Sequence, residues 1–387
     1  MSLDILIGAD LVPTISNHDY FSTADIEYLF GSELVGILKE HDFRVFNLET
    51  PLTDVTSPIE KSGLNFSAPV STIKGIKALN PSLLCLANNH ILDQGEQGIL
   101  STISLLNINS IPYVGAGKNL TEASTPYIFT ENGVKLGVYA CAEHEFSIAS
   151  ETRAGANPFD QLESPDHIFD LKNKCDYVIV LYHGGKEYYR YPSPYLQKCC
   201  RKIAEKGADF IVCQHSHSIG CYEDYNGSTI VYGQGDFLFD MSKNEFRKTA
   251  LLISIKLSNN KSAVVNHIPV IKCNNQVRLA DDVQAGEIMS SFISRSQNIL
   301  TEGFVESEYL TFAESKHVSY IKALHGNNLT FKAINKLTKN KLINLLYSRK
   351  ALVKILNYIE CESHRELIAA SIKNRLNNKN ETPLKNP

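Results

Sequence analysis

Residues 83–93 read Leu83-Leu84-Cys85-Leu86-Ala87-Asn88-Asn89-His90-Ile91-Leu92-Asp93, and this stretch decides the fold. A short apolar run that ends in turn-forming side chains is typical of a strand buried on both faces of a sheet. In open α/β sheets, ligands bind just beyond the carboxyl ends of such strands. The polar residues after Ala87 are therefore candidates for binding and catalysis, although Asn and Asp are also ordinary turn residues.

Four more short apolar runs end in polar residues of the same kind. They are Ile5–Ile7, followed by Asp10; Val45–Phe46, followed by Asn47 and Glu49; Tyr177–Leu181, followed by His183; and Phe210–Cys213, followed by His215 and His217. One histidine after a strand is more often a hydrogen-bonded structural residue. Five strand ends that bring histidines and carboxylates to one rim instead predict a metal site, and this ligand mixture suits zinc, manganese or iron. If the segment is extended, both rings of His215-x-His217 lie on one side of it.

The order of apolar and helical patterns predicts an α/β fold with helices packed on sheets. Further strands are predicted at Ile111–Val114, Lys135–Cys141, Ala250–Leu257 and Ser262–Val270, the last two around a turn at Asn259-Asn260. Helices are predicted at Ser71–Asn80, Gln97–Asn107 and Tyr195–Lys206. Gly207 follows the third helix as a plausible stop.

Composition excludes several classes of protein. Of 387 residues, 43% are hydrophobic and 21% are charged, so the chain is neither disordered nor of low complexity. A net charge of −4 argues against a basic nucleic-acid-binding protein, and no apolar run approaches the roughly 18–20 residues of a membrane helix. The start lacks the basic segment of a signal peptide, and the nine cysteines form no C-x-x-C pair. We therefore interpret the cysteines as reduced and expect a cytoplasmic protein.

The C-terminal part has a different character, because from Asp281 onward the pattern is mostly helical. Residues 332–387 contain 12 Lys and Arg against 4 Asp and Glu. Such basic helices could bind an anionic partner or a membrane surface, or they could simply present a solvated face. Residues 377–387 are predicted to be disordered.

Several motifs, in order over roughly residues 3–240, resemble the CapA family of bacterial capsule and poly-γ-glutamate synthesis proteins. The matching stretches are Asn47-Leu48-Glu49, Leu86–Gly98 (LANNHILDQGEQG), Ile111–Gly117 (IPYVGAG), His183–Tyr188 (HGGKEY), Gly207-Ala208-Asp209, His215-Ser216-His217 and Tyr232–Asp240 (YGQGDFLFD). The chain departs from the family pattern at Cys213, Gln214 and Ser216, and Asp236 replaces a usual Asn. Compared with calcineurin-like phosphoesterases, Asp10-Leu11-Val12 lacks the histidine of Asp-x-His.

The resemblance implies a layered, metallophosphatase-like β-sandwich flanked by helices. This domain is expected to span residues 1–275. The residues beyond about 280 fall outside the resemblance, and their pattern predicts a helical C-terminal extension at 281–376 and the disordered tail at 377–387.

The resemblance also implies roles for the residues at the strand ends. Glu49 would bridge two divalent metal ions (Mn, Fe or Zn), Asp10 and His217 would complete the first site, and Asn89, His183 and His215 the second. His90 would be the catalytic acid. Asp93 would either orient His90 or cap the following helix. Asn47, Asn88, Lys186, Glu187 and Arg190 are candidates for substrate binding, although the segment around Arg190 could also be plain packing. Gly115 and Gly117 could admit a substrate to the backbone or simply end a strand.

Two function classes remain open after these assignments. The first is a metal-dependent hydrolase, a phosphoesterase that acts on a phosphate-bearing small molecule or polymer precursor. The second is a non-hydrolytic accessory factor that binds a phosphorylated or polyanionic intermediate of polymer assembly.

Overall fold

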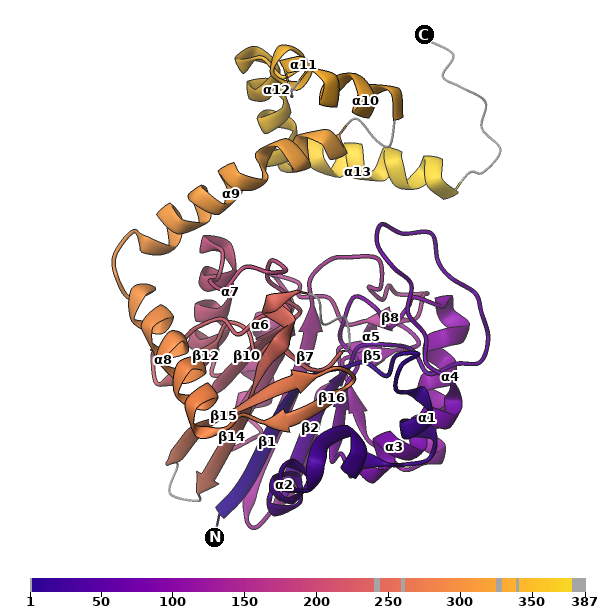
Figure 1. Cartoon of the computed structure of the whole chain (residues 1–387), viewed down its shortest axis with the longest axis vertical. Helices are drawn as coiled ribbons and strands as arrows, with labels where there is room; N and C mark the ends of the chain where they lie inside the picture. Colours follow the sequence, from indigo (N-terminus) through magenta and orange to yellow (C-terminus); the bar gives the residue numbers. More distant parts are fainter. Residues whose placement is uncertain (1, 240–243, 259–261, 325–328, 339–340, 378–387) are drawn as a thin grey trace. The chain divides into compact units, whose positions relative to one another are not determined.

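The computed structural model describes residues 2–239, 244–258, 262–324, 329–338 and 341–377. The chain divides into two compact units, Met1–Tyr309 and Leu310–Pro387, which we call unit 1 and unit 2. The turn predicted at Asn259-Asn260 and nearly all of the predicted disordered tail lie outside the described residues. Figure 1 colours the chain by residue number, and all of the predicted site residues fall within the numbers of unit 1.

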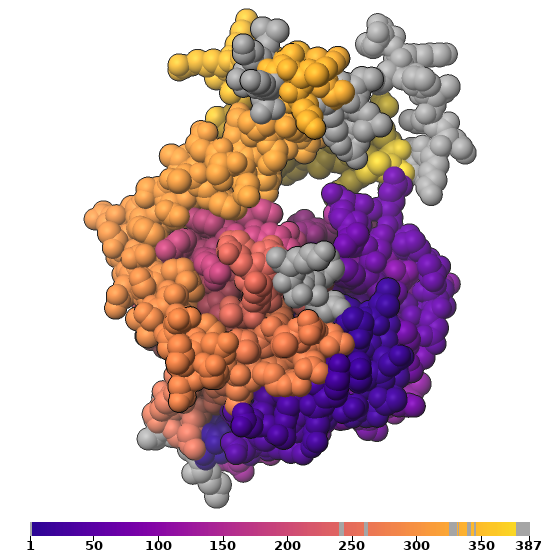
Figure 2. All heavy atoms as spheres, viewed as in Figure 1, coloured from indigo at the N-terminus to yellow at the C-terminus, as the bar shows by residue number. Residues whose placement is uncertain are grey.

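One large sheet, sheet 1, has the strand order β16-β15-β14-β1-β2-β3-β4, and β13 also pairs with β1. Its strands are β1 (Ser2–Leu11), β2 (Phe43–Leu48), β3 (Leu83–Cys85), β4 (Tyr113–Val114), β13 (Asp236–Leu238), β14 (Thr249–Ser258), β15 (Ala263–Cys273) and β16 (Gln276–Leu279). Strands β1 to β4 run parallel, so their carboxyl ends point to the same edge. The later strands β14 to β16 extend the sheet in antiparallel fashion beside β1. In Figure 2 the orange part of unit 1 accordingly adjoins the indigo N-terminal part.

A second sheet, sheet 2, has the strand order β11-β12-β10-β9-β7-β6. Its strands are β6 (Tyr127–Glu131), β7 (Val134–Ala142), β9 (Tyr177–His183), β10 (Phe210–Gln214), β11 (Tyr222–Tyr225) and β12 (Ser228–Val231). The central strands β7, β9, β10 and β12 are parallel. A short ribbon of β5 (Ala116–Gly117) and β8 (Gly155–Ala156) completes the strands.

Helices cover both sheets. In unit 1 they are α1 (His18–Ser22), α2 (Ile26–Glu40), α3 (Ile73–Ala78), α4 (Gly95–Ile108), α5 (Leu120–Ala123), α6 (Ser164–Lys172), α7 (Pro194–Glu205) and α8 (Asp282–Asn298), with 3-10 turns η1 (Val70–Thr72) and η2 (Glu245–Lys248). Helix α9 (Phe304–Ala323) begins in unit 1; unit 2 contains α10 (Leu329–Leu337), α11 (Lys341–Leu346), α12 (Arg349–Glu360) and α13 (Glu362–Asn377). Within the described ranges, no helix combines the length and the apolar character needed to cross a bilayer.

The hydrophobic core explains the layering. One cluster contains residues of both sheets, such as Ile5 and Val45 of sheet 1 and Val138 and Ile179 of sheet 2, so these sheets pack on one another. A second cluster joins the other face of sheet 2, through Val180 and its neighbours, to α6 and α7. The predicted fold class, a layered α/β fold with sheets flanked by helices, is confirmed.

The sequence around helix α7 explains where this helix begins and ends. The Ser193 side chain accepts a hydrogen bond from the Leu196 backbone N–H, and Pro194 occupies the first turn, where no backbone donor is needed. Gly207, with φ of +105°, follows the helix as predicted. Strand β3 is shorter than predicted, since it ends at Cys85, but the Leu86 N–H still donates to the Val114 carbonyl at 2.9 Å.

Candidate metal centre

The predicted site residues gather where strands of both sheets end. Strands β1 and β2 of sheet 1 end at Leu11 and Leu48, and β9 and β10 of sheet 2 end at His183 and Gln214. The two edges touch, because Gln214 Nε2 donates to the Gly8 carbonyl at 3.1 Å. The rim inferred from the sequence is therefore formed by the meeting edges of two sheets.

Glu49 lies between the other candidate ligands and accepts no hydrogen bond from the described residues. Its side chain is fully buried, and neither carboxylate oxygen accepts a hydrogen bond within the described residues. Burial raises the pKa of this carboxyl. A buried carboxylate without a partner is costly unless it is protonated or meets a cation, so this position suits a metal ion.

Three candidate ligand atoms surround Nε2 of His183. Asn89 Oδ1 lies 3.1 Å away, His215 Nδ1 3.1 Å away and Glu49 Oε1 3.4 Å away. Donor atoms that bind one ion at roughly 2.1 Å lie roughly 3 Å apart, so this spacing fits a shared cation. Burial lowers the pKa of His183 to about 4 and that of His215 well below its ordinary value. Both rings are thus neutral at pH 7, the form that binds metals.

His217 belongs to two overlapping sets of candidate ligands. Its nitrogens lie with oxygens of Asp10 and Asp236 in one set, and with Glu49 and His215 in the other; within each set the ligand atoms are at most 4.8 Å apart. Burial, and then the charge of Glu49, raise the pKa of Asp10 to about 7. Two adjacent buried carboxyls that resist ionisation together are suited to a shared divalent cation.

Asp236, on β13, was not among the predicted site residues. Its Oδ1 lies 2.6 Å from His217 Nδ1, and Lys272 Nζ on β15 donates to its Oδ2 at 3.0 Å. Arg247 Nη1 lies 3.6 Å from the same oxygen. Burial opposes ionisation, but Lys272 and His217 hold the pKa of Asp236 well below its usual range. The sequence offered one sign that Asp236 matters, because the family usually has Asn at this position. No sequence pattern indicates that Lys272 is the partner of Asp236.

Asn47 and Asn88 are fully buried and bonded to other site residues. Asn47 Nδ2 donates to Asp10 Oδ1 at 2.7 Å and lies 3.2 Å from His183 Nδ1. Asn88 Nδ2 donates to Asn47 Oδ1 at 3.0 Å and to the Leu48 carbonyl at 2.9 Å. These contacts orient Asp10 and His183. Direct contact of Asn47 and Asn88 with a substrate stays a prediction.

His90 is held by Asp93. His90 Nδ1 lies 2.6 Å from Asp93 Oδ2, which also accepts from the Phe66 N–H at 2.7 Å. Lys61 forms an ion pair with Asp93 and lies 3.2 Å from His90 Nδ1. Helix α4 has no side-chain cap, so of the two roles considered for Asp93 the structure displays the contact with His90. Lys61 was not predicted, because it lies in the irregular segment between β2 and η1 and in no motif.

Of the three remaining candidates, Glu187 and Lys186 lie beside the centre and Arg190 lines a separate cavity. Glu187 Oε1 is 4.0 Å from His217 Nε2, and Lys186 is close enough for its charge to act on His215. The guanidinium of Arg190 instead lies over the Phe246 ring, 4.7 Å from its centroid, and lines a separate cavity.

The backbone after β10 differs from the extended segment assumed above. His215 has φ of +86° and His217 has φ of +52°, so both adopt left-handed conformations that non-glycine residues rarely take. The assumption of an extended segment was wrong because β10 ends at Gln214. Their rings nevertheless lie 5.8 Å apart, and local strain of this kind is common where side chains are aimed at a ligand.

The family model described as bacterial capsule synthesis protein PGA_cap matches residues 4–241, which include the whole centre except Arg247 and Lys272. The chain belongs to this capsule synthesis family. The predicted CapA resemblance is thereby confirmed.

Two relatives carry CapA names. The chain is 30% identical over 276 residues to the capsule biosynthesis protein CapA of Bacillus anthracis, covering 69% of this chain and 65% of that protein. It is 29% identical over 220 residues to the PGA biosynthesis protein CapA of Bacillus subtilis strain 168, covering 56% of this chain and 58% of that protein. The chain thus spans less than two thirds of these PGA_cap relatives.

Solved structures with a similar course of the chain include two that are described as enzymes. A phosphatase from Mycoplasma pneumoniae has a TM-score of 0.44 and 14% identity, covering 70% of this chain and 94% of that one. A 5'-nucleotidase precursor from Thermus thermophilus has a TM-score of 0.40 and 12% identity, covering 76% of this chain and 58% of that one.

Proposed function

We propose that this PGA_cap protein is a metal-dependent phosphoesterase that acts on a phosphorylated precursor of capsule or poly-γ-glutamate synthesis. The observation that carries the proposal is the buried carboxylate of Glu49, which accepts no hydrogen bond within the described residues and lies beside the neutral rings of His183 and His215. Asp10, Asn89, His183, His215 and His217 would hold the metal with it. Bound divalent ions at such a centre lower the pKa of a water molecule and neutralise phosphoryl charge.

The residues of the chain then have separate tasks. His90 is bonded to Asp93 through Nδ1, which leaves Nε2 to donate a proton to the leaving oxygen of the ester. Lys61 adds a positive charge beside the pair. Asn47 and Asn88 fix the orientation of Asp10 and His183, and Asp236 fixes the ring of His217 through Nδ1.

The test is hydrolysis of p-nitrophenyl phosphate and bis(p-nitrophenyl) phosphate by chelator-treated protein that is reloaded with Mn, Fe or Zn. Mg and Ca serve as comparison ions because they prefer oxygen ligands. The account predicts metal-dependent turnover that falls by about 10²–10⁴-fold in His90→Asn, with metal content unchanged. Turnover without metal, or unaltered turnover in His90→Asn, would contradict it.

A second candidate function is supported by the residue at position 12. Val12 is buried where the Asp-x-His pattern of phosphoesterases has a histidine, so the first site has one imidazole fewer. On this proposal the same centre binds a phosphorylated or polyanionic intermediate without hydrolysing it. Tight metal binding with no turnover of either ester would favour this accessory role.

A further inference from the structure

A second cavity lies in unit 1 between α8 and the segments that carry Arg190 and Ile219. It has a volume of about 330 Å³. Its side chains include Arg190, Arg295, Thr249, Ser291 and Glu287. Two aromatic rings separate it from the metal centre, because Arg190 lies over Phe246, whose ring contacts Tyr188 beside His217.

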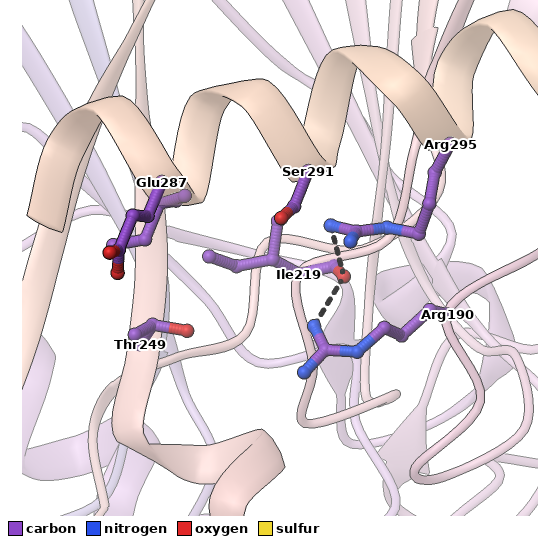
Figure 3. A pocket seen from close by; sticks show the side chains of 7 residues that line it. Arg190, Ile219, Thr249, Glu287, Ser291 and Arg295 are labelled. Carbon is purple, nitrogen blue, oxygen red and sulfur yellow. Dashed lines mark hydrogen bonds between the residues drawn. The ribbon is translucent and has the colours of Figure 1, made fainter.

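Both guanidinium groups converge on one backbone carbonyl (Figure 3). Arg190 Nη1 donates to the Ile219 carbonyl at 3.1 Å, and Arg295 Nη2 donates to the same oxygen at 3.2 Å. Arg295 Nε also donates to the Gly220 carbonyl at 2.7 Å. An arginine has five N–H donors, so each side chain keeps donors that no acceptor of the described residues uses.

The positive charge in this cavity is poorly neutralised. Burial and the neighbouring Arg190 lower the pKa of Arg295 to about 10, and no carboxylate of the described residues counters this effect. Burial lowers the pKa of Arg190, and among the described residues the charge of Glu245 opposes this shift without forming an ion pair. Two like charges held together in a half-buried pocket are costly, and an anion between them would offset that cost.

The two ends of the cavity differ in charge. Ser291 and Thr249 place hydroxyl groups on opposite sides of it, and the carboxylate of Glu287 lies at the end away from the arginines (Figure 3). The wall is held in place, since Tyr222 N–H donates to Ser296 on α8 at 2.9 Å. The arginine end is therefore preorganised for a negative group, and the Glu287 end repels one.

We infer that this cavity binds an oxyanion, the carboxylate or phosphate end of a ligand, between Arg190 and Arg295. Planar guanidinium groups match both oxyanions through paired hydrogen bonds. The site is separate from the metal centre and does not depend on hydrolysis there.

The test compares two glutamate substitutions on one helix. Both serines are exposed, but only Ser291 lines the cavity: Ser291→Glu places a carboxylate in it, whereas Ser290→Glu adds the same charge outside it. Metal-free, full-length protein is titrated calorimetrically with inorganic phosphate and, separately, with γ-glutamylglutamate at constant ionic strength. Removing the metal keeps phosphate binding at the metal centre from dominating the signal.

Ser291→Glu is expected to weaken binding about tenfold or more, because its carboxylate takes the place of the anion, while Ser290→Glu changes it less than about twofold. Glu287→Gln should strengthen binding, since it removes a repulsive charge without touching the arginines. Binding of phosphate alone would identify a phosphate ligand, and binding of the dipeptide alone a carboxylate ligand. Equal affinities in Ser291→Glu and wild type, or no binding of either probe to wild type, would overturn the inference. Because no metal or ester is involved, these outcomes are distinct from failure of the hydrolase proposal.

Discussion

At position 49 a fully buried carboxylate lies beside the neutral imidazoles of His183 and His215, and neither of its oxygens is hydrogen-bonded within the described residues. Asp10 is buried nearby and is equally reluctant to ionise. In the absence of metal these two carboxyls destabilise the fold when both are charged, and metal binding removes that cost. Metal binding at this centre would therefore stabilise the fold and depend on pH.

Asp10 should give the metal-free protein a measurable pH dependence. Its pKa is raised from 3.8 to about 7, so between these values the folded state binds more protons than the unfolded state. Stability contributed by the protonated carboxyl is full below about pH 4 and is lost as pH rises through 7. His183 and His215, with lowered pKa values, act in the opposite direction below pH 6.5, so the comparison must be made with Asp10→Asn.

Relative to Asp10→Asn, metal-free wild type should lose on the order of a few kcal/mol of unfolding free energy between pH 4 and 7. Urea denaturation at several pH values measures this difference. A difference that stays constant with pH would show that Asp10 titrates normally.

Asp236 offers a second test at the scale of single residues. Asp236→Asn would leave Lys272 buried and unpaired, and breaking such a pair typically costs about 3–5 kcal/mol. Asp236→Asn with Lys272→Met should be less destabilised than Asp236→Asn alone, because no buried ammonium group remains. Chemical denaturation checks both, and an equal loss in the single and double variants would exclude the charge of Lys272 as the cause.

The residues of the centre differ in how far the sequence could predict them. Glu49, Asn89, His183, His215 and His217 stand in family motifs, whereas Asp10 was predicted from its place after a strand; the structure brings all six together. Lys61, Arg247 and Lys272 stand in no motif. Their partners lie elsewhere in the sequence, and only the tertiary structure shows which residues they contact.

At the scale of elements, Gly115 explains how closely the two sheets approach. A Cβ atom at this position would lie 2.6 Å from the Cβ of Ala87 and 2.8 Å from that of Ala140. Gly115 also has φ of +85°. Close packing between the two sheets therefore explains why position 115 is a glycine, in addition to its place at the end of a strand.

Gly115→Ala should therefore destabilise the protein by about 1–3 kcal/mol through overpacking, with a further cost from its backbone conformation. Gly286→Ala is the matched control, because Gly286 lies on α8 with no atom near its would-be Cβ. The control should be neutral or stabilising by up to about 1 kcal/mol. Thermal unfolding of both variants decides the matter, and similar melting temperatures for the two would count against the packing argument.

Elements with clear local signals were predictable, as for α7 with Ser193 before it and Gly207 after it. Helix α2 was not predicted, because Gly31, with φ of +73°, interrupts its regular period. The strands β11 to β13 are short, and their pairing depends on contacts that no local pattern encodes.

At the scale of the whole molecule, the hydrophobic clusters and all candidate metal ligands belong to unit 1. The two-sheet arrangement followed from the family resemblance, since apolar periodicity indicates strands but does not assign them to sheets. An anionic partner for the basic C-terminal helices stays a prediction.

Deleting residues 329–387 should leave metal content unchanged and the main unfolding transition within a few degrees of wild type. The reason is that, among the described residues, the deleted helices contribute no residue to either hydrophobic cluster and no candidate metal ligand. Elemental analysis and calorimetry of the truncated protein measure both quantities. Loss of metal on truncation would place part of unit 2 in the functional core.

The most direct test of the central claim is the metal content of wild type and Glu49→Gln after purification and after reloading with Mn, Fe or Zn. Glutamine keeps the size of the side chain and removes the charge that the centre offers to a cation. The account predicts about two ions per chain in wild type and at least one ion fewer in Glu49→Gln, with both proteins folded. Equal metal content in the two proteins would contradict it.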